Sequence, residues 1–63
     1  MSLETITRFD NGSIQVDVTP IVHSQYWRLA LDEIIDQRYQ DRGVVEIRAH
    51  RILSNSGQIL FTF

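Results

Sequence analysis

The chain has no cysteine, so neither a disulfide bond nor a thiolate metal site can supplement its hydrophobic core. It contains a single proline and three glycines, and no apolar run approaches the ~18 residues that a membrane-spanning helix needs. The first five residues, from Met1 to Thr5, lack the basic segment and the apolar segment of a secretory signal. We therefore expect one domain over residues 1–63, located in the cytoplasm.

Lysine is also absent, because all six basic residues are arginines, and with eight acidic residues the net charge is −2. Proteins that bind nucleic acid or anionic membranes through their overall field usually carry a basic excess, which this chain lacks. No GxGxxG, GxxxxGK[ST], HExxH, CxxC or GxSxG pattern occurs. We therefore expect no enzymatic activity, no cofactor and no metal.

The first clear signal in the chain is a β-hairpin. Asp10-Asn11-Gly12 favours a tight turn, since asparagine and glycine tolerate positive φ angles. Residues 4–9 and 13–18 flank it and have the composition of strands. In the second of these strands the apolar side chains alternate with polar ones, and Ile14, Val16 and Val18 fall on one face.

A helix is predicted after this hairpin. Thr19 can act as its N-cap with Pro20 in the first helical position, and Ser24 is an alternative N-cap one turn later. The helical pattern runs to about Asp41, and Gly43 follows where a left-handed C-cap residue belongs.

A second hairpin follows the helix, with a strand over 44–53, a turn over 54–57 and a strand over 58–63. The predicted order is ββαββ. We expect an α+β fold in which two β-hairpins are joined by one amphipathic helix packed on an antiparallel sheet, which is the economical way to bury the apolar faces.

The helix has a core stripe composed of Trp27, Ala30, Leu31 and Ile34, with Ile35 at its margin. His23 and Arg38 lie at the two ends of this stripe. They either sit at the rim of the core or form the polar end of a pocket beside Trp27, which would suit a small molecule or an enzymatic reaction.

The opposite face of the helix carries a second apolar cluster. Val22, Tyr26 and Leu29 are spaced i, i+4 and i+7 there, beside Glu33. Three clustered apolar side chains on a second face are typical of a contact surface, unless the chain itself folds over them. Glu33 also forms an acidic ridge with Asp32 and Asp36, which is either solvated or suited to docking a basic partner.

The strand over 44–53 carries a local basic cluster of Arg48, His50 and Arg51. Arginines on the face of a sheet can contact phosphates, so nucleic-acid binding is an alternative function. Alternation places Val45, Ile47 and Ala49 on one face of this strand, with Arg51 continuing that face.

The last strand has no charged residue from Gln58 to Phe63 and no proline to protect it as a sheet edge. Such an edge can pair with a second copy or with a strand of another protein. The leading hypothesis is a small non-enzymatic interaction or regulatory module, homodimeric, that binds a larger protein through this edge and the outer helix face of Val22, Tyr26, Leu29, Glu33 and Asp36. The alternative is a nucleic-acid-binding regulator that uses Arg48, His50 and Arg51.

Overall fold

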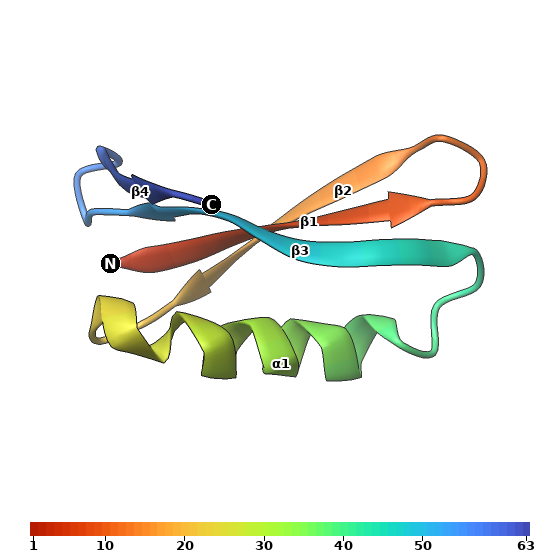
Figure 1. Ribbon diagram of the computed structural model, residues 1–63, viewed down its shortest axis with the longest axis horizontal. Helices are drawn as coiled ribbons and strands as arrows, with labels where there is room; N and C mark the ends of the chain where they lie inside the picture. Colours follow the sequence, from red (N-terminus) through yellow and green to blue (C-terminus); the bar gives the residue numbers. More distant parts are fainter.

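The computed structural model describes all 63 residues as one antiparallel sheet with a single helix across one of its faces (Figure 1). The strands lie in the order β2-β1-β3-β4, so β2 and β4 are the two edges. The predicted ββαββ order and the packing of one helix on an antiparallel sheet are confirmed. The elements are β1 (Ser2–Phe9), β2 (Ile14–Pro20), the 3-10 turn η1 (Ser24–Tyr26), α1 (Trp27–Arg38), β3 (Val44–Leu53) and β4 (Ile59–Thr62).

The first hairpin turn forms where the sequence predicts it. Phe9 N–H donates to Ser13 O at 2.9 Å, and Gly12 has a φ angle of 86° that an L side chain rarely adopts. Asn11 Oδ1 accepts from the Ser13 N–H at 2.9 Å, so the asparagine side chain takes the place of a backbone carbonyl in the turn. The second predicted turn also forms, since Ser54 N–H donates to Gln58 O at 2.8 Å.

The helix begins later than predicted. Thr19 and Pro20 do not cap it, because they are the last residues of β2 and pair with β1. Ser24 is the first residue of η1 rather than a cap. His23 caps η1, since its Nδ1 accepts from Gln25 N–H at 3.2 Å, and α1 follows from Tyr26 without a side-chain cap. Strand pairing therefore outweighs the local capping preference at Thr19 and Pro20.

The helix also ends at Arg38 rather than at Asp41. Gly43 has a φ angle of 81°, but it closes the loop that follows the helix instead of capping the last helical turn. Its carbonyl oxygen accepts from Asp10 N–H at 2.8 Å, so it ties the start of β3 to the first hairpin.

The core lies between α1 and the central strands β1 and β3. On the helix Ala30, Leu31 and Ile34 are buried while Trp27 and Ile35 are half-buried, which confirms the predicted core stripe. The sheet contributes small or aliphatic side chains to this core: Leu3, Thr5, Thr7, Ala49 and Ile52.

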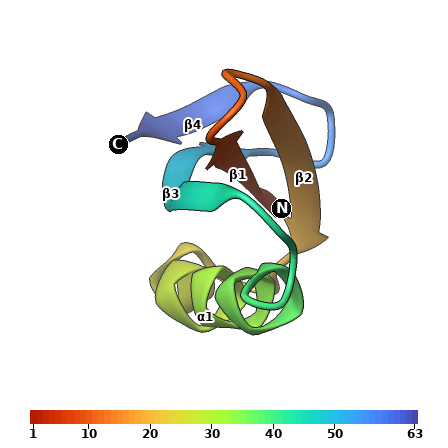
Figure 2. The ribbon, with the colours of Figure 1, turned by 90° about the vertical axis from the view of Figure 1, so that its right-hand side faces the viewer.

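The apolar face of β2 points away from this core. Register places Thr19, Asp17 and Gln15 beside the buried side chains of β1, so polar residues occupy the helix-facing side of β2. Ile14, Val16 and Val18 lie on the opposite face and are 62%, 51% and 57% exposed. The short turn fixes which residues of β2 face the helix, because a register slip of one residue would move every side chain of the strand to the other face of the sheet. Figure 2 shows the helix below one face of the sheet and nothing covering the other.

A bulge in β3 changes the predicted sidedness of Arg51. Thr5 pairs with Ala49 whereas Glu4 pairs with Arg51, so His50 is an additional residue in β3. Ile52, which is 3% exposed, takes the core position after the bulge. The expectation that Arg51 continues the face of Ala49 is therefore wrong, since Arg51 and His50 both reach Glu4.

Candidate interaction surfaces

The apolar cluster predicted on the outer helix face is uncovered, but only Leu29 belongs to α1, because Tyr26 is the last residue of η1 and Val22 precedes η1. Val22 is 90% exposed, Leu29 63% and Tyr26 41%. With Pro20, the last residue of β2, and Ile21, which follows it, these side chains line a shallow groove of about 230 Å³. The alternative in which the chain itself, through its last strand or its N-terminus, folds over this cluster is therefore wrong. We call Val22, Tyr26, Leu29, Glu33 and Asp36 the helix patch.

The acidic part of the helix patch has no partner within the chain. Glu33 lines the groove, and both Glu33 and Asp36 are exposed. Asp32, the remaining member of the predicted acidic ridge, differs because its Oδ1 lies 3.5 Å from Arg28 Nε. The helix patch thus combines an apolar centre with carboxylates that are not neutralised.

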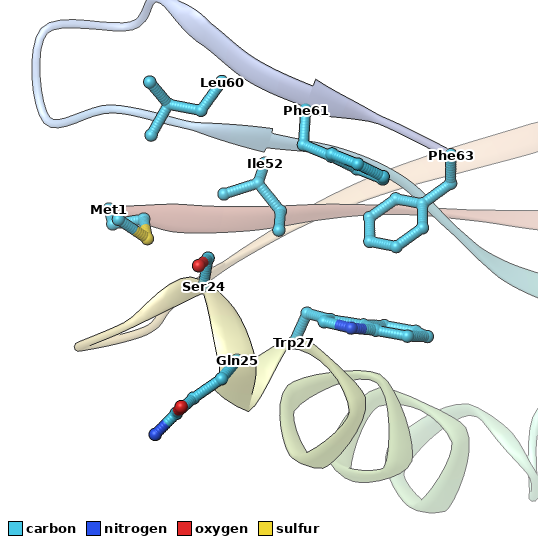
Figure 3. A pocket seen from close by; sticks show the side chains of 8 residues that line it. All are labelled: Met1, Ser24, Gln25, Trp27, Ile52, Leu60, Phe61 and Phe63. Atoms are coloured by element: carbon cyan, nitrogen blue, oxygen red, sulfur yellow. The ribbon is translucent and has the colours of Figure 1, made fainter.

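A second apolar surface lies on the other side of α1, where the helix does not cover β4. Trp27, Phe61 and Phe63 form an aromatic cluster with ring centroids 4.7 Å apart for Trp27 and Phe63 and 4.9 Å apart for the two phenylalanines. They line an open pocket of about 520 Å³ (Figure 3), here called the aromatic groove, whose other walls are Met1, Ser24, Gln25, Ile52 and Leu60.

The aromatic groove was not predicted from the sequence. The spacing of Phe61 and Phe63 indicates one face of a strand and favours the core, but Phe61 is 54% exposed and Phe63 41%. Pairing places β4 at a sheet edge, where α1 reaches it only through Trp27, because the rest of the helix packs on the other strands. The helix patch and the aromatic groove share no residue, so the predicted helix and edge-strand sites are two surfaces rather than one.

The predicted basic cluster is partly engaged within the sheet. Glu4 is 8% exposed and accepts from Arg51 Nε at 2.8 Å, while His50 Nδ1 lies 2.8 Å from the same oxygen. Burial alone would raise the pKa of Glu4, but the contacts with Arg51 and His50 outweigh it and lower that pKa below 4.5. Arg48 alone among the three is exposed and has no ion pair.

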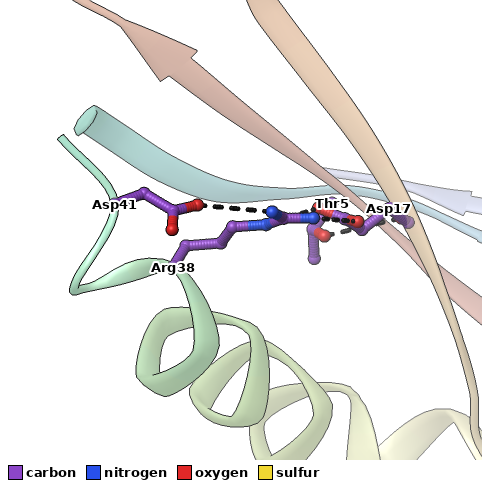
Figure 4. Close-up of polar contacts among 4 residues, drawn as sticks. All are labelled: Thr5, Asp17, Arg38 and Asp41. Carbon is purple, nitrogen blue, oxygen red and sulfur yellow. Dashed lines mark hydrogen bonds and ion pairs between the residues drawn. The ribbon is translucent and has the colours of Figure 1, made fainter. Parts of the chain in front are cut away.

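His23 and Arg38 do not form a pocket with Trp27. His23 caps η1, and Arg38 lies at the far end of α1, where its guanidinium contacts Asp17 of β2 at 2.7 Å and Asp41 at 3.3 Å (Figure 4). The hydrogen bond that Arg38 donates to Asp17 is the main reason that the pKa of Arg38 is raised. Arg38 therefore fastens the polar side of β2 to the helix and is not directed into a cavity.

No family model, curated protein or solved structure matches the chain. No helix is both long enough and apolar enough to cross a membrane. No three side chains of histidine, cysteine, aspartate or glutamate are grouped as metal ligands would be.

Proposed function

We propose that the protein is a small interaction or regulatory module, homodimeric, that acts by binding a larger protein through the helix patch and the edge strand β4. The observation that carries this proposal is the exposure of Val22 and Leu29, at 90% and 63%, beside a groove at the end of β2. A clustered apolar surface with a polar rim is typical of protein–protein contact sites.

The charge of the helix patch indicates the chemistry of its partner. Glu33 and Asp36 are exposed and lack ion pairs, so a matching surface would present aliphatic or aromatic side chains flanked by lysine or arginine. Such complementarity governs specificity and the association rate more than the affinity itself. Binding through the helix patch should therefore weaken as the salt concentration rises.

The open edge of β4 supports a second mode of contact for the same kind of partner. Gln58 to Phe63 contains no charge, and the aromatic groove lies beside the strand on its helix-facing side. An extended segment that pairs with β4 could place an apolar side chain in this groove.

Site-specific photo-crosslinking in the source cells tests the helix patch. A photoreactive residue at position 29 should capture one defined protein, whereas the same residue at Glu46, an exposed position of β3 away from α1, should capture none. Replacing Tyr26 by serine in the position-29 protein should abolish the adduct without unfolding the chain. Equal capture at both positions, or capture at position 29 that Tyr26→Ser does not reduce, would refute the proposal.

Nucleic-acid binding is the alternative function, and Arg48 is the observation that favours it, because this arginine is exposed and unpaired on the sheet face. Arg51 and His50 are held by Glu4, so less positive charge is free than the sequence indicates. Binding to DNA or RNA that falls steeply with salt and is lost in Arg48→Ala, Arg51→Ala would support it. No binding at low salt would exclude it.

A further inference from the structure

The edge of β2 differs from that of β4 in its regularity. The pairing of β1 with β2 runs without a register shift from Ser2↔Pro20 to Arg8↔Ile14, whereas the pairing of β3 with β4 is interrupted next to Leu53. β2 has seven residues and β4 has four. A long and regular edge is the better template for a further strand, and the only charged residue of β2, Asp17, is already paired with Arg38.

The direction of the peptide groups of β2 follows from its two ends. Phe9 N–H donates to Ser13 O, and Ile21 N–H donates to Met1 O, so the odd-numbered residues of β2 are bonded to β1. Peptide groups alternate in direction along an antiparallel strand. The N–H and C=O groups of Ile14, Val16 and Val18 therefore point to the open edge. Pro20, which has no N–H to offer, occupies the last outward position.

These three outward residues are also the exposed apolar residues of β2, at 62%, 51% and 57%. Their sequence is self-complementary in an antiparallel sense. If Val16 lies opposite Val16 of a second copy, Ile14 lies opposite Val18 of that copy, and the outward peptide groups of all three residues gain partners. The side-chain pairs are then β-branched residues, which stabilise antiparallel pairing.

Charge on the other face selects the same register. With Val16 opposite its equivalent, Gln15 lies opposite Asp17 of the second copy, so an amide faces a carboxylate. A shift of two residues that centred the pairing on Asp17 would place two carboxylates directly opposite each other, which is unfavourable. A shift of two residues in the opposite direction would centre the pairing on Gln15. The outward peptide group of Val18 would then have no strand residue of the second copy opposite it.

We propose that the protein self-associates through the β2 edge, with Val16 at the two-fold axis, to form a continuous eight-stranded antiparallel sheet. This assignment rests on the homodimeric part of the proposed function, but not on the helix patch or on β4. The exposed stripe of Ile14, Val16 and Val18 doubles in width along the joined sheet, and both helices lie on the same face of that sheet. β4 then remains free at each end.

Two charge variants at the axis test this assignment. Val16→Lys and Val16→Glu each place like charges opposite each other, so each should raise the dimer dissociation constant about tenfold or more. A one-to-one mixture of the two should recover a heterodimer, because opposite charges then meet. Analytical ultracentrifugation measures both effects, and circular dichroism checks that the variants are folded.

The matched control is Thr62→Lys. Phe63 N–H donates inward to His50 O, so Thr62 occupies an outward position of β4 equivalent to that of Val16 in β2. This variant should leave the dissociation constant within about twofold of the unchanged protein. Slow amide exchange at Val16 and Val18 in concentrated samples, and fast exchange in dilute ones, is the expected residue-level signature.

The outcomes separate the two proposals. A protein that stays monomeric at millimolar concentration overturns this inference together with the homodimeric part of the proposed function. A dimer that persists in Val16→Lys, or that dissociates only in Thr62→Lys, overturns the inference alone. Capture of a partner at position 29 is unaffected by either result.

Discussion

Replacing Glu4 by glutamine tests how much the charge of its carboxylate contributes to the stability of the sheet. Glu4 is 8% exposed, and its carboxylate accepts from Arg51 through both oxygens, at 2.8 Å and 3.2 Å. His50 Nδ1 lies 2.8 Å from one of these oxygens. Glutamine keeps the size of the side chain, but it removes the negative charge and turns an amide NH₂ group toward a guanidinium that has only donors to offer.

The expected loss is moderate. Hydrogen bonds to charged groups contribute about 1.5–3 kcal/mol in proteins, but the side chains of Arg51 and His50 are about one-third exposed, at 34% and 33%, so solvent screens part of this. We expect Glu4→Gln to lower the free energy of unfolding by about 1–2 kcal/mol at pH 7. For a domain of this size each kcal/mol corresponds to a fall in Tm of about 4–8 °C.

The pH dependence makes the test specific. Because the folded-state pKa of Glu4 is lowered, its ionised form adds stability above the ordinary carboxyl value of 4.5, and this stability is lost as the pH falls through the lowered value. The difference between the unchanged protein and Glu4→Gln should therefore be full at pH 7 and shrink in acid. Urea unfolding across this range measures it.

Glu46→Gln is the matched control, because its ion pair with Arg8 spans 3.7 Å and both side chains are at least half exposed. This substitution should change the free energy of unfolding by less than about 0.5 kcal/mol at any pH. A Glu4→Gln protein as stable as the unchanged one at pH 7, or a difference of the same size in acid, would refute the reasoning.

The remaining predictions concern stability, and unfolding in urea measures each of them. Leu3→Ala removes a fully buried side chain from the core, so it should cost about 2–5 kcal/mol or prevent folding, and a loss under 1 kcal/mol would contradict the described packing. Gly43→Ala should cost more than Gly12→Ala, although both glycines have positive φ angles, because the added Cβ would lie 2.6 Å from Asp10 Oδ1 and Gly12 has no neighbour within 4 Å; equal losses would contradict this. Thr7→Val should stabilise the protein by about 1 kcal/mol, since the buried Thr7 hydroxyl has no hydrogen-bond partner in the protein, and destabilisation would count against it.

Local signals were sufficient for the order of the elements. The glycine turns and the alternation of the strands are decided within a few residues, so the ββαββ order and the bounds of β3 follow from the sequence. The helix ends were less predictable. Thr19 and Pro20 have the local chemistry of a helix start, but their pairing with β1 is a contact over almost twenty residues that the local pattern does not contain.

The sidedness of β2 could not be predicted for a related reason. Its alternation is the clearest in the chain, and alternation identifies two faces without stating which face the helix covers. The face of β2 that the helix covers is determined by its pairing with β1. The buried face of β1 carries Leu3, Thr5 and Thr7, and two threonines do not identify a core face from the sequence. Threonine is buried there because the central strand lies directly under the helix.

The candidate surfaces divide in the same way. The exposure of Tyr26 and Leu29 was predictable, since helical periodicity separates them from the core stripe and needs no knowledge of the sheet. Val22 is exposed too, but it lies before η1, so its exposure does not follow from that periodicity. The aromatic groove and the β2 edge were not predictable, because both depend on which strands lie outermost. The order β2-β1-β3-β4 is a property of pairing between distant segments.

The exposed apolar residues do not reflect loose packing. The accessible surface is 4415 Å², and a folded monomer of 7.4 kDa is expected to have about 4,200 Å², so the chain is compact for its size. Nevertheless only 9 of its 63 residues are buried. One helix of 12 residues covers one face of the central strands and leaves the outer face of β2 and the inner face of β4 open. A second copy joined along β2 enlarges the structure without a longer chain. It pairs the backbone groups of the longest open edge, and it leaves the helix patch and the β4 edge as the surfaces on which a different protein can dock.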